Sequence, residues 1–101
     1  YNLGTQIMAA KKITFVKKIF ADGSPCKKCG EVMEKMEAAN QMRFIDEVVV
    51  ADEADAESLG MLLAKQYDVS KAPFFIVEQV DGQVDVYTIY FKLVKDVLYH
   101  L

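Results

Sequence analysis

The pattern of apolar and polar positions changes from strand to helix and back along the first half of the chain. Residues 13–20 (ITFVKKIF) are rich in β-branched and aromatic side chains and end at the turn-forming run ADGSP, which predicts a strand. In residues 26–39, apolar side chains recur every three or four positions between charged ones, which predicts an amphipathic helix. Residues 44–51 (FIDEVVVA) end in a continuous apolar run, typical of a strand covered on both faces.

The second half of the chain begins with another helical pattern. Asp52 or Asp55 can cap a helix that runs to Tyr67. Its apolar positions are three leucines, which we expect to be buried: Leu59, Leu62 and Leu63.

A hairpin and a last helix follow. Residues 74–80 (FFIVEQV) and 84–90 read as two strands joined by a two-residue turn, Asp81-Gly82. The helix is predicted from about residue 91 to the end of the chain. It should bury four apolar side chains, Phe91, Val94, Val97 and Leu98.

The predicted order β-α-β-α-β-β-α defines an α/β fold. Strands joined through helices should lie parallel, whereas the hairpin must be antiparallel, so we expect a mixed sheet of about four strands with helices on both faces. Ligands of such sheets gather at the C-terminal ends of parallel strands. We expect one domain over residues 13–101, preceded by an N-terminal tail or tag remnant in residues 1–12.

Composition narrows the classes of function. The formal net charge is -3 and the Lys and Arg residues are scattered, which argues against nucleic acid as a partner. No apolar run approaches the roughly 20 residues that cross a bilayer, and no secretory signal pattern opens the chain, so we expect no membrane partner and a cytoplasmic location. Two cysteines are too few for a disulfide-stapled secreted scaffold. We expect a monomer.

These two cysteines form the motif SPCKKCG at the predicted start of the first helix. Unpaired N–H groups of that helix end favour the thiolate at Cys26, and Lys27 and Lys28 add positive charge beside it. Cys29 lies one turn further on, where its sulfur can reach that of Cys26. We therefore predict Cys26 as the nucleophile and Cys29 as the resolving thiol, with Pro25, Lys27 and Lys28 tuning their reactivity.

Other uses of a CxxC pair fit this chain less well. Structural zinc takes four protein ligands, and beyond the two cysteines the chain offers only His100, near its C-terminus. Haem attachment needs His directly after the second cysteine, where this chain has Gly30. Incidental helix cysteines and a metal site shared across a dimer remain alternatives. We expect no metal and no bound organic cofactor.

From about residue 13 onward, the chain resembles the thioredoxin family. The resemblance rests on the strand followed by the CxxC helix and on the segment ADEADAESLGMLLAKQYDVSKAP, which ends in the pattern Y-x-V-x-x-x-P. It implies that Pro73 is cis and faces the cysteines, and that the backbone of Ala72 pairs with an extended substrate segment.

The chain also departs from the family pattern. It has no Trp, and Lys-Lys stands between the cysteines where the family usually has Gly-Pro. The family's buried acid near the end of the first strand is missing, and the nearest carboxylate in sequence is Asp22. A glutaredoxin would carry proline inside the cysteine pair, so a glutathione-dependent reductase is the weaker reading.

The resemblance implies a thiol-disulfide oxidoreductase. The thiolate of Cys26 attacks a substrate disulfide to form a mixed disulfide, and Cys29 then releases the reduced substrate. The expected partners are a protein or small molecule bearing a disulfide and an upstream reductant, either glutathione or an enzyme like thioredoxin reductase. The alternative is a module of the same fold that binds partners or senses redox state without turnover.

Overall fold

The computed structural model describes residues 10–100 of the chain. Most of the predicted N-terminal tail, residues 1–9, lies outside the described residues. The first strand begins at Ala10, three residues earlier than the apolar pattern predicts.

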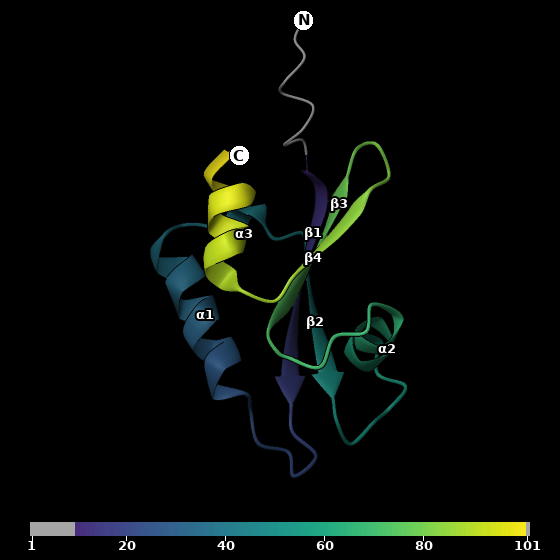
Figure 1. The fold of residues 1–101 in the computed structure, drawn as a ribbon. Helices are drawn as coiled ribbons and strands as arrows, with labels where there is room; N and C mark the ends of the chain where they lie inside the picture. Colours follow the sequence, from purple (N-terminus) through teal and green to yellow (C-terminus); the bar gives the residue numbers. More distant parts are fainter. Residues whose placement is uncertain (1–9, 101) are drawn as a thin grey trace, which may run out of the picture.

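Four strands form one mixed sheet in the order β2-β1-β3-β4 (Figure 1). They are β1 (Ala10–Ile19), β2 (Glu47–Asp52), β3 (Phe74–Gln79) and β4 (Val84–Tyr87). β1 pairs in parallel with β2 and antiparallel with β3, and β3 and β4 form the antiparallel hairpin. The C-terminal ends of β1 and β2 therefore lie side by side at one end of the sheet.

Helices cover both faces of this sheet. They are α1 (Lys27–Ala38), α2 (Leu59–Gln66) and α3 (Tyr90–Asp96), with short 3-10 segments at η2 (Met42–Phe44) and η3 (Leu98–His100). Figure 1 shows α1 and α3 on one face and α2 on the other. The predicted α/β class, the element order and the mixed four-stranded sheet with helices on both faces are confirmed.

The alternation of side chains along the strands produces two cores, one on each face. Phe15 and Phe75 stack at 5.0 Å between ring centroids in the core beneath α1 and α3, which includes Leu93. Val16 and Phe74, one residue away on the same strands, belong to the core beneath α2. Because β1 and β3 bury side chains on both faces, burial determines the register in which they pair.

The direction of β3 differs from the prediction. We expected strands joined through helices to be parallel, but β3 is antiparallel to β1 and therefore to β2. The eight residues of α2 do not carry the chain across to the far end of the sheet, so β3 starts at the end where β2 stops (Figure 1). The loop before β3 consequently lies at the same end of the sheet as the loop after β1.

The second strand starts later than predicted. Phe44 closes the 3-10 segment η2, and β2 begins only at Glu47. The prediction that this strand is covered on both faces is also wrong, because β2 is an edge strand and Val48 is exposed.

The second helix begins at the N-cap Ser58, so neither Asp52 nor Asp55 caps it. Both aspartates instead hold the preceding turns, where their carboxylates accept the N–H groups of Ala54 and Glu57. The buried face of α2 also differs from the prediction. Leu59 and Leu62 are exposed, while Leu63 packs against the core.

The hairpin loop is longer than the predicted two-residue turn. The N–H of Gln79 donates to the carbonyl of Gln83 at 2.8 Å, so Val80 belongs to the loop as well. A two-residue type I′ turn needs positive φ at both central positions, and only Gly82, with φ of 91°, adopts it.

One of the four side chains predicted to be buried on the last helix is exposed, and a side chain that was not predicted is buried in the core. Phe91 is 71% exposed, whereas Leu93 is fully buried. Val97 and Leu98 are buried as predicted. Within residues 10–100, no helix has the length and apolar character needed to span a membrane.

Candidate redox site

A tight loop after β1 positions the first cysteine. The N–H of Phe20 donates to the carbonyl of Ser24 at 2.9 Å, and the carboxylate of Asp22 accepts both the N–H and the hydroxyl of Ser24. The loop turns the chain back so that the N–H of Cys26 donates to the carbonyl of Lys18 at 3.2 Å. Cys26 is thereby held beside the end of β1.

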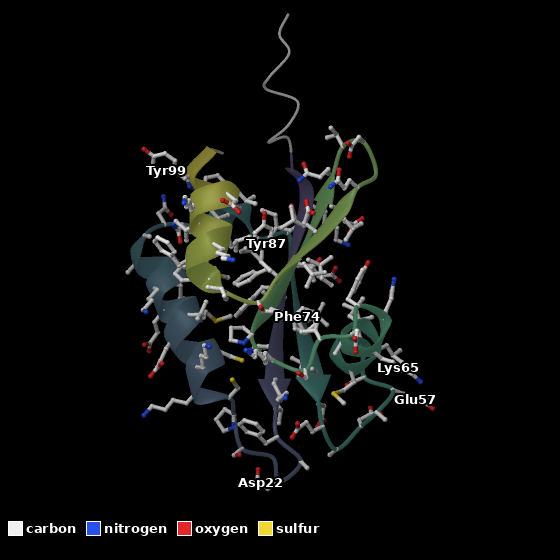
Figure 2. The ribbon with its side chains drawn as sticks, viewed as in Figure 1. Asp22, Glu57, Lys65, Phe74, Tyr87 and Tyr99 are labelled. Atoms are coloured by element: carbon white, nitrogen blue, oxygen red, sulfur yellow. The ribbon has the colours of Figure 1, made fainter. Side chains whose placement is uncertain are left out.

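Asp22 is the nearest carboxylate to the cysteines in sequence, but the structure uses it within the loop. Its hydrogen bonds from Ser24 lower the pKa of its carboxyl group. Figure 2 shows it at the tip of the loop, at the lower end of the view. Asp22 does not line the cavity at the two cysteines.

Cys26 is the N-cap of α1, and Cys29 lies in the first turn. The N–H of Cys29 donates to the Sγ of Cys26 at 3.1 Å. Both cysteines are free thiols, and their side chains lie close to each other inside the molecule, with 9% of Cys26 and 3% of Cys29 exposed. A donor N–H at a helix N-terminus favours negative charge on the sulfur that accepts it.

The second thiol has the opposite environment. Burial, together with the adjacent sulfur of Cys26, raises the pKa of Cys29 to about 12. A backbone hydrogen bond from Lys18 and the positive charge of that residue act in the opposite direction. Cys29 is therefore a protonated thiol at neutral pH.

A cavity of about 200 Å³ opens at the cysteine pair. Cys26 and Cys29 line it together with Lys17, Lys18 and Met33. The described part of the chain contains no group of three or more His, Cys, Asp or Glu arranged to hold a metal ion. The cavity therefore brings together two adjacent thiols and two lysines.

A second cavity of about 220 Å³ lies on the α2 side of the sheet. Lys18 lines it as well, along with Glu53, Lys71 and Ala72. Lys18 is thus common to the cavity at the cysteines and to the one beside the loop before β3.

The Ala72–Pro73 peptide bond is cis, the geometry that the resemblance implies. Phe74 pairs with Val16 across the antiparallel ladder, so this loop lies beyond the ladder at the same end of the sheet as Lys18. Pro73 is buried and Ala72 is partly buried. The binding of substrate by Ala72 and Pro73 stays a prediction.

The three residues predicted to tune the site lie around it. Pro25 is exposed and forms a β-bridge with Ile19. Lys27 and Lys28 are exposed at the start of α1.

Sequence reasoning missed an ion pair next to these residues. The Nζ of Lys18 lies 3.2 Å from the Oε2 of Glu53, and both side chains are partly buried. Opposite charges at the ends of two adjacent parallel strands were the available signal, since the pairing of Ile19 with Asp52 brings those ends together. That signal could be read only once the register was known.

No protein-family model matches the chain, and no curated protein matches it. Among solved structures, the chain is similar to the thioredoxin Mala s 13 of Malassezia sympodialis, at 20% sequence identity and a TM-score of 0.49. The match covers 95% of this chain and 81% of that chain.

Proposed function

We propose that this protein is a thiol-disulfide oxidoreductase that exchanges electrons through Cys26 and Cys29. The observation that carries the proposal is the hydrogen bond of 3.1 Å from the N–H of Cys29 to the Sγ of Cys26 at the start of α1. The bond links the sulfur at the N-cap, where the helix favours negative charge, to the residue that carries the buried thiol in the first turn of the same helix.

The reaction takes place in two steps of thiol-disulfide exchange. The thiolate of Cys26 attacks one sulfur of a substrate disulfide, which forms a mixed disulfide and releases the other substrate sulfur as a thiol. Cys29 then attacks the sulfur of Cys26, so that the intramolecular disulfide forms and the second substrate thiol leaves. The substrate is reduced by two electrons and the cysteine pair is oxidised. Glutathione or a reductase enzyme then restores the dithiol.

Ala72 and Pro73 are proposed to receive the substrate. In this proposal the backbone of Ala72 offers polar groups to an extended peptide, and Pro73 lacks an N–H that would compete for them. Placement of this loop at the same end of the sheet as the cysteines supports the assignment.

Disulfide reduction by the purified protein tests the proposal. The assay follows reduction of insulin with dithiothreitol, glutathione or thioredoxin reductase as the electron source. We expect turnover by the natural chain and none by Cys26→Ser. The variant Cys29→Ser should accumulate a mixed disulfide, detectable by mass spectrometry. The absence of turnover with every reductant would reject the proposal.

The direction of electron flow follows from the equilibrium reduction potential of the cysteine pair. A potential of about -270 mV would indicate a reductase, whereas a potential above about -180 mV would indicate an oxidant or isomerase.

A second candidate is a module that senses redox state without turnover. The low exposure of Cys26, 9%, favours it, because a catalytic nucleophile must be reached by its substrate. Such a module would form the Cys26–Cys29 disulfide with small oxidants yet fail to reduce insulin. Comparing the rate of oxidation by a small disulfide with the rate of insulin reduction separates the two candidates.

A further inference from the structure

Lys18, near the end of β1, contacts both the first cysteine and a carboxylate beside the second cavity. The carbonyl of Lys18 accepts the N–H of Cys26, and its ammonium group lies 3.2 Å from a carboxylate oxygen of Glu53. The ammonium also lies 5.8 Å from the ring centroid of Phe20. Only 20% of the Lys18 side chain is exposed, so its ammonium group is partly dehydrated and its position is fixed by the ion pair.

Glu53 is itself fixed by backbone groups on both sides. Its Oε1 accepts the N–H of Ala21 at 3.2 Å, and its own N–H donates to the carbonyl of Ile19 at 2.9 Å. The position of the Lys18–Glu53 pair is therefore determined by the end of the parallel β1–β2 ladder.

Cys29 needs help to lose its proton. Its side chain is buried, and the cavity beside it is lined by the apolar Met33 and by three titratable groups: Lys17 and Lys18 from β1 and Cys26 from the loop. Among the described residues that line this cavity there is no carboxylate. The carboxylate of Glu53 is linked to the site through its ion pair with Lys18.

We propose that Lys18, held in place by Glu53, stabilises the thiolate of Cys29 while it resolves a mixed disulfide. The inference rests on the proposed function. Lys18 is a positioning residue in this step, because its charge acts on Cys29 and it transfers no proton.

The step balances without a further reactant. The thiol of Cys29 gives its proton to water, and its sulfur attacks the sulfur of Cys26. The Cys26–Cys29 bond forms as the bond from Cys26 to the substrate breaks, and the departing substrate thiolate takes a proton from water. Positive charge beside Cys29 favours the first of these events.

The ion pair makes two substitutions act in opposite directions. Lys18→Met removes the cation and keeps the length of the side chain, which should lower the thiolate fraction of Cys29. Glu53→Gln keeps a hydrogen-bond acceptor for Lys18 but removes the opposing negative charge, which should increase that fraction. A purely structural role predicts damage of the same kind from both.

The experiment titrates Cys29 in the background Cys26→Ser by the ultraviolet absorbance of its thiolate, taken as the difference from Cys26→Ser/Cys29→Ala so that the absorbance of the tyrosines cancels. We expect Lys18→Met to move the midpoint upward by about one pH unit, a tenfold loss of thiolate at a given pH, and Glu53→Gln to move it downward. Lys18→Arg, which keeps the charge, should preserve the midpoint. In the chain with both cysteines, release of substrate from the mixed disulfide should be roughly threefold slower in Lys18→Met, because the greater nucleophilicity of a thiolate with a higher pKa offsets part of the loss of thiolate.

Shifts in the same direction, or no shift in either variant, would overturn the inference. If Lys18→Met does not fold, Glu53→Gln decides alone, and an unchanged or raised midpoint overturns it. The titration does not require turnover. Opposite shifts in a protein that reduces no disulfide would reject the proposed function alone, whereas turnover without shifts would reject the role of Lys18 alone.

Discussion

The backbone N–H of Cys29 donates to the Sγ of Cys26 at 3.1 Å, so the second cysteine supplies a hydrogen-bond donor to the sulfur of the first. The first sulfur accepts a donor at a helix N-terminus, whereas the second is buried behind it and its pKa rises to about 12. The two thiols are therefore chemically unequal although only two residues separate them.

The raised pKa of Cys29 predicts that the reduced protein becomes less stable in alkaline solution. The unfolded chain releases this proton near the ordinary thiol value of 9.0, while the folded chain keeps it up to about 12. Folding thus favours the protonated form, and the free energy of unfolding falls as pH rises through this window. Urea unfolding of the reduced protein below and above pH 9 measures the effect.

Lysines and tyrosines also titrate in alkaline solution, so the comparison requires a matched variant. Cys29→Ala lacks the titrating thiol and should lose less stability than the natural chain over the same rise in pH. Equal losses in both proteins would contradict the assignment of a raised pKa to Cys29.

Close contact between α2 and β2 predicts a large effect of a small substitution. A Cβ atom at Gly60 would lie 2.3 Å from the backbone nitrogen of Ala51, where neither backbone can give way cheaply. We expect Gly60→Ala to lower the free energy of unfolding by about 1–3 kcal/mol through overpacking. Thermal or urea unfolding checks this.

The matched control for that substitution is Gly30, which is exposed on α1. A Cβ there meets nothing within 4 Å, and alanine is favoured over glycine in a helix by about 0.5–1 kcal/mol. Gly30→Ala should therefore stabilise the protein. A Gly60→Ala variant as stable as the natural chain would show that α2 can move away from the sheet.

The sequence predicted the class of each strand and α-helix because periodicity is a local property, but it did not predict the 3-10 segments η2 and η3. Strands β1 and β3 and helix α1 follow from their apolar spacing, and the start of α1 beside the cysteines follows from the turn before it. Strand direction was not predictable in the same way. Whether β3 runs parallel to β1 depends on how far α2 carries the chain, and a spacing pattern holds no information on that distance.

The residues of the candidate site also differ in how far they could be predicted from local sequence. Cys26, Cys29 and the lysines between them are adjacent in sequence and could be assigned from the motif. Glu53 directly follows β2, and the register of β1 with β2 brings it to Lys18. Long-range pairs of this kind become visible only when the fold is known.

Two residues of α3 should respond very differently to truncation. Leu93 is fully buried in the core beneath α1 and α3, whereas Phe91, two residues earlier, is 71% exposed. We expect Leu93→Ala to cost about 2–5 kcal/mol of stability, because it leaves a cavity in a packed core. Phe91→Ala should change stability by about 0.5 kcal/mol or less. Urea unfolding of the two variants side by side tests the helix orientation, and a larger loss for Phe91→Ala would contradict it.

The exposed lysines at the start of α1 predict a preference for anionic disulfides. Lys27 and Lys28 lie between the two cysteines in sequence and add positive charge at the exposed start of α1, although the net charge of the chain is -3. Such local charge raises the encounter rate with an oppositely charged substrate. The double variant Lys27→Gln/Lys28→Gln should react with oxidised glutathione roughly threefold to tenfold more slowly at low ionic strength. Its rate with a neutral disulfide should be affected less.

The matched control removes the same charge far from the cysteines. Lys35→Gln/Lys92→Gln alters two exposed lysines, one in the last turn of α1 and one in α3. Because Coulomb attraction weakens with distance, this variant should slow the reaction with oxidised glutathione less than Lys27→Gln/Lys28→Gln does. Added salt should erase the difference between the natural chain and Lys27→Gln/Lys28→Gln. If both double variants slow the reaction equally, the preference comes from the net charge of the protein, and the lysines between the cysteines have no special role.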